Sequence, residues 1–234
     1  MQNITSRFFT TEDEKSETFF FKLNPSWWSR FYEYPWAANF ASKNDTCLDA
    51  ACGINHPFKF YLADNCLDVY ALDLDDRILN RSEIKKDIIN AFGEKELEKI
   101  NNNKYFESIK YLKSPLTKIP CTAKKFDKIY CLSVLEHIND WNGKLAPLNR
   151  FPITKNLKPD SFYKTLTEFN RVLKDDGLII LTFDYPNINL DYFKKIIKKC
   201  SLKFADENNF NLPNNAIYNS TKKLYCFRAV LKKI

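Results

Sequence analysis

The sequence has 234 residues, of which 44% are hydrophobic and 15% aromatic, so it can build one domain with a full core. It has no run of 18 apolar residues, which excludes a membrane-spanning helix, and its first fifteen residues lack the pattern of a secretory signal. Its seven cysteines form no C-x-x-C pair, which argues against a zinc site and favours reduced thiols in a cytoplasmic protein.

The net charge of +7 comes from one end of the chain. Residues 191–234 hold ten Lys or Arg and three acids, while residues 1–190 balance. In residues 191–200 the lysines alternate at helical spacing with apolar side chains, which indicates an amphipathic helix with a solvated lysine face. Specific nucleic-acid binding is therefore not expected.

Strands and helices are predicted to alternate along most of the chain. Two helices are expected within residues 11–41, separated at Asn24-Pro25, because proline disfavours helix in the residue before it. The expected strands are 46–51, 68–73, 108–113, 127–133 and 178–183, and a closing hairpin is expected from 202–205 and 224–231. The expected helices are 56–64, 76–92, 160–174 and 191–200.

This alternation predicts an α/β fold with a mostly parallel sheet and helices on both faces. We expect seven strands, with the last pair antiparallel, and an N-terminal helical lid. Residues 1–234 are expected to form a single domain, with the lid at 1–43 and the catalytic core at 44–234. Ligands in such sheets bind at the carboxyl ends of the strands.

A turn and an acid suggest a nucleoside site. The strand at 46–51 runs into a turn with Gly53, and the next strand ends in Asp73, twenty residues further on. Such a turn lets backbone approach a ligand, and such an acid accepts hydrogen bonds from two ribose hydroxyls. A dinucleotide site would need more glycines, but Ala51 and Asn55 stand in their places.

Four segments together resemble class I S-adenosylmethionine-dependent methyltransferases over roughly residues 45–184. They are LDAACG (48–53), the strand ending in Asp73, FDKIYCLSVLEHI (126–138) and LTEFNRVLKDDGLIILTF (166–183). The resemblance implies S-adenosylmethionine as cofactor and S-adenosylhomocysteine as product. The chain departs from the family's pattern at Ala51, Asn55 and Ser114-Pro115. The cofactor-binding candidates are Arg30, Asp49, Ala51, Gly53, Asn55, Asp73, Leu74, Ser114, Pro115 and Leu132.

His137 and Glu136 are the catalytic candidates, just past the strand at 127–133. A neutral imidazole can take a proton from a hydroxyl near neutral pH. The alternative is that the two residues cap the next helix and shape the pocket. A Glu-x-x-Glu-His metal cluster, as in some RNA-end methyltransferases, would begin at Ser133, so no metal is expected. His56 is interpreted as a helix-start residue.

Two segments are candidates for the substrate wall. The run RFYEYPWA, which begins at Arg30, resembles methyltransferases of bacterial surface-polysaccharide synthesis and suggests Arg30 or Tyr32 near the methionine carboxylate or an anionic acceptor. Residues 139–160 contain three prolines and little periodicity, which suggests a functional loop. The substrate-binding candidates are Tyr32, Tyr34, Trp141, Arg150, Asp184 and Tyr185.

The sequence therefore predicts an O-methyltransferase acting on a small molecule or a glycan precursor. The acceptor is a sugar hydroxyl or a sugar-linked phosphate-type group, as in capsular polysaccharide modification. The alternatives are a quinone or other small-molecule methyltransferase, a nucleic-acid methyltransferase, and an inactive cofactor-binding module.

Overall fold

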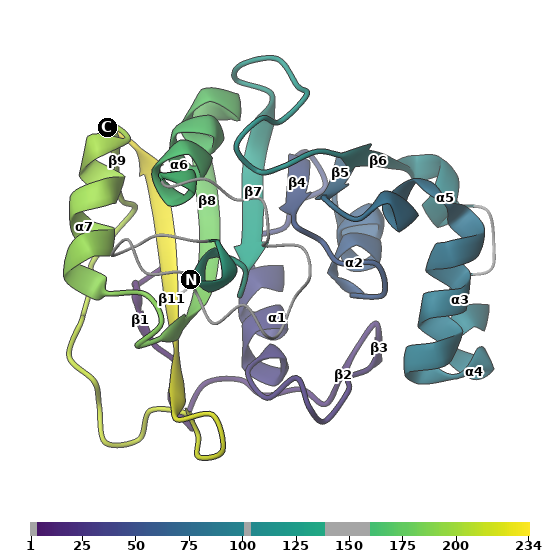
Figure 1. The fold of residues 1–234 in the computed structure, drawn as a ribbon, viewed down its shortest axis with the longest axis horizontal. Helices are drawn as coiled ribbons and strands as arrows, with labels where there is room; N and C mark the ends of the chain where they lie inside the picture. Colours follow the sequence, from purple (N-terminus) through teal and green to yellow (C-terminus); the bar gives the residue numbers. More distant parts are fainter. Residues whose placement is uncertain (1–3, 101–103, 139–159) are drawn as a thin grey trace.

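The computed structural model describes residues 4–100, 104–138 and 160–234, and within them one twisted sheet organises the chain (Figure 1). Its main path runs in the order β1-β11-β8-β7-β4-β5-β6, and two short strands, β9 and β10, also pair with β11. The strands are β1 (Arg7–Phe8), β4 (Thr46–Ala50), β5 (Asp68–Asp73), β6 (Ile109–Lys113), β7 (Phe126–Leu132), β8 (Leu173–Tyr185), β9 (Leu202–Phe204), β10 (Tyr218–Asn219) and β11 (Leu224–Lys233).

The centre of the sheet is parallel, as the sequence predicts. Strands β6, β5, β4, β7 and β8 all run in one direction, and β11 pairs antiparallel with β8, β9, β10 and β1. The closing pair of β9 and β11 is therefore confirmed. The strand count is not, because the described residues form nine strands in this sheet. The two additional strands are β1 and β10, each only two residues long.

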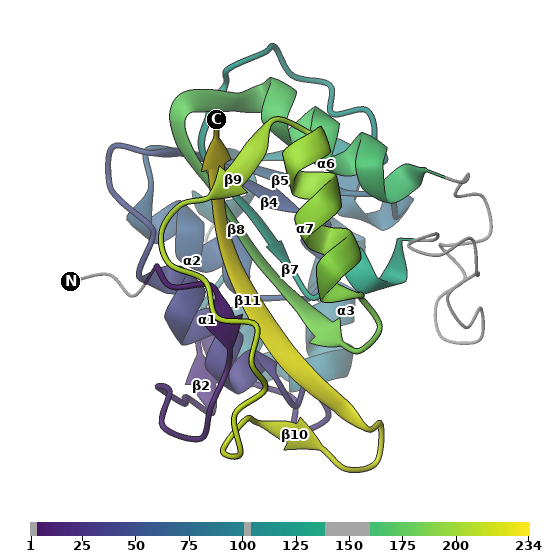
Figure 2. The same cartoon turned by 90° about the vertical axis from the view of Figure 1, so that its left-hand side faces the viewer.

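Helices cover both faces of the sheet (Figures 1 and 2). On one face, α6 (Ser161–Val172) and α7 (Leu190–Lys199) pack their apolar sides against one buried cluster. On the other face, α1 (Arg30–Ala38), α2 (Phe58–Asn65) and α3 (Arg81–Phe92) pack with the N-terminal segment on a second cluster. In α7, Phe193, Ile196 and Ile197 are buried, which confirms the amphipathic helix with an outward lysine face.

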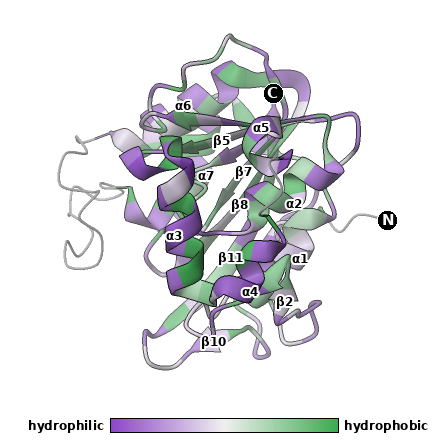
Figure 3. Cartoon of the chain, turned by 90° about the vertical axis from the view of Figure 1, so that its right-hand side faces the viewer, coloured by the Kyte–Doolittle hydropathy of each residue, from purple (hydrophilic) through white to green (hydrophobic). Residues whose placement is uncertain are grey.

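Short helices lie at the periphery or connect the larger elements. They are η1 (Asp76–Leu79), α4 (Glu94–Glu98), α5 (Lys104–Ser108) and η2 (Leu135–His137). The helix expected at 76–92 is divided between η1 and α3, because the Asn80 side chain accepts the amide of Ser82 and begins a new helix there. Figure 3 shows α4 almost wholly in hydrophilic colours, and none of its residues is buried.

The prediction of a first helix in the N-terminal segment is wrong. Residues 7–8 pair with β11, and β2 (Thr18–Phe19) and β3 (Phe21–Lys22) form a small hairpin. Arg7 and the buried Arg228 of β11 both bind the Asp13 carboxylate, which fixes this segment along the edge of the sheet. The second expected helix is present but begins only at Arg30. No helix among the described residues is long and apolar enough to cross a membrane.

Candidate active site

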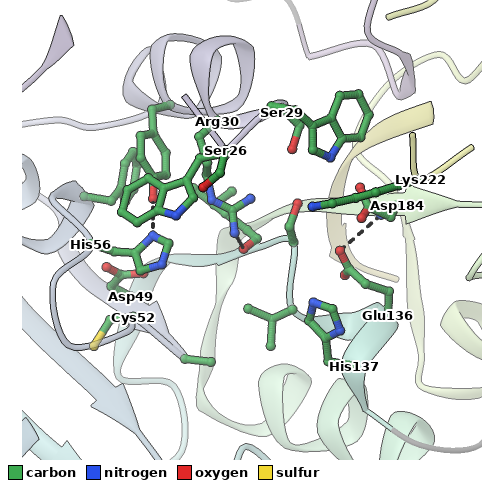
Figure 4. Close-up of a pocket in the computed structure, with 18 residues that line it drawn as sticks. Ser26, Ser29, Arg30, Asp49, Cys52, His56, Glu136, His137, Asp184 and Lys222 are labelled. Carbon is green, nitrogen blue, oxygen red and sulfur yellow. Dashed lines mark hydrogen bonds between the residues drawn. The ribbon is translucent and has the colours of Figure 1, made fainter. Parts of the chain in front are cut away.

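A cavity of about 330 Å³ opens at the carboxyl ends of β4 and β7. The segment that precedes α1, together with α1 itself, forms one wall, and η2 with the end of β8 forms the opposite wall (Figure 4). The lining residues are Ser26, Trp27, Trp28, Ser29, Arg30, Tyr34, Asp49, Ala51, Cys52, His56, Phe58, Leu132, Ser133, Val134, Glu136, His137, Asp184 and Lys222.

The turn after β4 has the backbone shape of a glycine-rich loop although it holds one glycine. Ala51 and Gly53 both adopt positive φ angles, 58° and 62°, a left-handed conformation that costs an L-residue about 1–2 kcal/mol. Ala51 thus accepts the conformation that glycine would take without strain. The departure from the family's motif at this position changes the residue but keeps the turn.

Two buried charged groups hold this turn in place. The Asp73 carboxylate accepts the amide of Gly53 through Oδ2 at 2.8 Å and the amide of Asp75 through Oδ1 at 3.0 Å. The Lys59 ammonium, which comes from α2, donates to the carbonyls of Gly53 at 2.8 Å and His56 at 2.7 Å. Burial lowers the pKa of Lys59, opposed by nearby acidic groups that include Asp49 and Asp73.

Asp49 is the most perturbed acid on this side of the cavity. It is 5% exposed, and its Oδ2 has no hydrogen-bond partner among the described residues. Burial raises its pKa to about 7, the Lys59 charge opposes that rise, and Asp73 adds to it. A cationic group in the cavity would relieve this unpaired carboxyl, so the site fits the ammonium or the sulfonium of S-adenosylmethionine.

Arg30 reaches the same end of the sheet from α1. Its guanidinium pairs with Glu33 and donates to the carbonyl of Leu132 at 3.1 Å. Burial opposes its charge, but Glu33, together with Tyr34 and Glu136, outweighs burial, so its pKa lies above the ordinary value. Glu33 itself is fully buried and accepts from Ser133 Oγ and from Cys226 Sγ. This network fixes α1 over the cavity.

The opposite wall carries acids and an imidazole. Glu136 is 2% exposed, its Oε1 accepts the amide of Asp184 at 3.2 Å, and its Oε2 has no partner among the described residues. Burial, and then the neighbouring Asp184, raises the pKa of Glu136 well above its ordinary value. In Figure 4, His137 lies beside Glu136 on this wall, and Lys222 lies beside Asp184.

His56, interpreted from the sequence as a helix-start residue, lies directly before Pro57, the N-cap of α2, and also lines the cavity. Its ring stacks on Trp27 with centroids 4.1 Å apart, and its Nδ1 bonds to the Tyr34 hydroxyl at 2.6 Å. Burial, and then the charges of Arg30 and Lys59, lower its pKa well below the ordinary value. His56 is therefore a neutral part of the cavity wall. No local pattern could reveal it, because its partners come from the segment before β4.

The structure brings several of the candidate residues together and leaves others apart. The cavity is lined by Arg30, Tyr34, Asp49, Ala51, Leu132, Glu136, His137 and Asp184. Among the described residues, the candidates that do not line it are Tyr32, Gly53, Asn55, Asp73, Leu74, Ser114, Pro115 and Tyr185. Trp141 and Arg150, with nearly all of the loop expected at 139–160, lie outside the described residues.

Three of the candidates away from the cavity have clear local reasons. Tyr32 packs near Phe9 and Tyr185 packs edge-on against Phe8, so both rings face the N-terminal segment. Tyr185 follows Asp184 in a strand, where successive side chains point to opposite faces. The Ser114 hydroxyl donates to the Lys118 carbonyl, while its amide donates to the carbonyl of Asp73.

Comparisons with known proteins agree with this geometry. A family model described as a methyltransferase domain matches residues 48–152. No protein of curated function matches the sequence. A TehB-like S-adenosylmethionine-dependent methyltransferase from Corynebacterium glutamicum is similar in structure, with 16% identity, a TM-score of 0.51, and coverage of 86% of this chain and 87% of that one.

Two further solved structures share the fold. A methyltransferase from Aquifex aeolicus is 15% identical with a TM-score of 0.52, over 91% of this chain and all of that one. One from Clostridium acetobutylicum is 13% identical with a TM-score of 0.52, over 90% and 92% of the two chains. The methyltransferase-domain match over residues 48–152 supports an S-adenosylmethionine-dependent methyltransferase, and the solved structures share its fold, with an acid-lined cavity at the ends of β4 and β7.

Proposed function

We propose that this chain is an O-methyltransferase that acts on a hydroxyl group of a small molecule or glycan precursor, such as a surface-polysaccharide building block. The observation that carries the proposal is the chemistry of the wall opposite Asp49, where Glu136, His137 and Asp184 lie together. Carboxyl and imidazole groups accept hydrogen bonds from hydroxyls and can take up their protons.

The same wall disfavours a phosphate-type acceptor. Glu136 and Asp184 offer a negative oxygen no positive partner, and any carboxyl that ionises there would repel it. Arg30 lies on the other wall, in α1, which leaves Lys222 as the described lining lysine beside Glu136 and Asp184. One lysine beside Asp184 and Glu136 does not make an anion site.

Each part of the chain then has a role in the transfer. The turn with Gly53, together with Asp49 near the end of β4 and Asp73 at the end of β5, binds the cofactor, which when bound supplies a methyl group on a positively charged sulfur. Asp49 accepts from the ammonium, and Arg30 lies near the carboxylate. Trp27 and Trp28 line the cavity and exclude water from it. Alignment of the acceptor oxygen with the methyl group in such a cavity is worth up to about 7–11 kcal/mol.

His137 is proposed as the general base. It removes the proton of the acceptor hydroxyl as the oxygen attacks the methyl carbon, and Glu136 orients that hydroxyl. Losing a positioned base costs roughly 10²–10⁴-fold in rate. Specific nucleic-acid substrates are not part of this proposal, because the lysine excess of α7 lies on a surface helix whose lysine side chains face outward.

The test measures transfer of a labelled methyl group from S-adenosylmethionine to a panel of free sugars, nucleotide sugars and sugar phosphates. We expect methylation at a hydroxyl and a loss of at least 100-fold in kcat for His137→Ala. Lys222→Ala serves as the matched change on the same wall and should alter KM more than kcat. Near-native turnover of His137→Ala with an unchanged pH profile, or methylation at a phosphate oxygen, contradicts the proposal.

A further inference from the structure

Two thiols lie in contact at the base of the cofactor loop. Cys47, in β4, is fully buried, and its Sγ lies 3.3 Å from the Sγ of Cys66, the partly exposed residue that ends α2. The backbone maintains this proximity, because the amides of Leu67 and Asp68 both donate to the carbonyl of Asp45. The end of α2 is thereby tied to the start of β4.

The two sulfurs differ in reactivity. The Cys47 thiol donates to the Cys66 sulfur, and this bond, helped by the Ser42 backbone and the Lys43 charge, lowers the pKa of Cys66 although burial opposes it. The same bond, and then burial, raises the pKa of Cys47. Cys66 is also the more exposed of the two. It is therefore the sulfur that meets an oxidant as a thiolate.

We propose that Cys47 and Cys66 form a modification site, at which hydrogen peroxide or a related peroxide converts the pair into an intramolecular disulfide. The Cys66 thiolate attacks one peroxide oxygen, the O–O bond breaks, and a sulfenic acid and hydroxide form. The Cys47 sulfur then attacks the sulfenic sulfur. The S–O bond breaks, the Cys47 proton leaves with the hydroxide as water, and the disulfide forms. In total, two thiols are oxidised and one peroxide is reduced to two waters.

The position of this bond gives it a consequence. A disulfide between residues 47 and 66 closes a loop that contains Asp49, Ala51 and His56, which line the β4 end of the cavity, and the Gly53 turn between them. Cross-linking restricts the unfolded chain, and a loop of about this length raises the melting temperature of a chain this size by about 5–10 °C. Oxidation would therefore lock the cofactor loop onto β4.

The experiment treats the full chain with hydrogen peroxide, blocks the remaining thiols by alkylation, and maps digested peptides by mass spectrometry. We expect a peptide pair joined through Cys47 and Cys66, with a mass two hydrogens below the sum, and a higher melting temperature that reductant reverses. Cys66→Ser should abolish both. Cys121→Ser removes another partly exposed thiol and should change neither.

A denatured sample treated in the same way gives the pairing expected without native contacts. The proposal is overturned if the folded chain yields the same mixture of pairs as the denatured chain. It is also overturned if Cys66 accumulates as a sulfinic acid, or as a sulfenic acid, while Cys47 remains alkylated. The result does not depend on the methyl acceptor, so it can fail while the proposed function stands.

Discussion

Replacing Asp49 by asparagine should have opposite effects on stability and on cofactor binding. The Asp49 pKa is about 7 in the folded chain and 3.8 ordinarily. Below pH 3.8 the carboxyl is protonated in both states and carries no penalty. As the pH rises towards 7, the unfolded chain releases this proton and the folded chain keeps it, so stability falls. Above pH 7 the full penalty, about 4 kcal/mol, is present.

Asp49→Asn removes this penalty but leaves an amide where Oδ2 has no partner, which costs about 1–3 kcal/mol. The variant should therefore be about 1–3 kcal/mol more stable than the native chain at pH 8, and less stable or equal at pH 4. Urea unfolding at the two pH values measures both numbers. Asp176→Asn, at an exposed position of β8, removes an equal charge and is the control.

Cofactor binding should move the other way. Calorimetry with S-adenosylhomocysteine at pH 7.5 should show a loss of roughly tenfold or more for Asp49→Asn, because a charge-assisted hydrogen bond is worth about 1.5–3 kcal/mol. If the variant is no more stable than the native chain at pH 8, the ionised Asp49 carboxylate does not carry this free-energy penalty. If its affinity is also unchanged, Asp49 does not face the ligand.

Three further changes test the loop itself. Ala51→Gly should raise the free energy of unfolding by about 1 kcal/mol in urea titrations, because it relieves the positive φ, and a decrease would contradict that reading. Lys59→Met should cost about 3 kcal/mol of stability and weaken S-adenosylhomocysteine binding, since two buried carbonyls lose a charged donor; a variant with a native urea midpoint would show the contacts to be dispensable. Asp73→Ala should weaken S-adenosylhomocysteine binding at least tenfold by calorimetry, and native affinity would remove Asp73 from the ribose site.

The parallel core was predictable because its information is local. Strands β5, β7 and β8 contain apolar runs, and the spacing of Gly53 and Asp73 pointed to two groups that are in contact in the structure. The position of Glu136, His137 and Asp184 at the cavity was predictable for the same reason, since residues that follow parallel strands gather at one edge of the sheet.

The N-terminal segment was not predictable in this way. Its strand β1 forms because Arg7 and Phe8 pair with Arg228 and Phe227, more than 200 residues away. A strand of two residues is too short to show a periodic pattern in the sequence. The contact of Trp27 with His56 has the same origin, because it joins a loop to a turn across the cavity. Such contacts depend on tertiary packing that overrides local propensity.

The hydrogen bond from Cys226 to Glu33 has a consequence for how the molecule is made. Glu33 holds Arg30 over the cavity, yet Cys226 belongs to β11, which the ribosome produces some 190 residues after α1. The strands from β4 to β8 are made first, and Glu33 gains its Cys226 partner only once β11, which lies between β8 and β1, has been made. A chain that lacks β11 therefore lacks one of the contacts that hold Glu33, and through it Arg30, at the cavity.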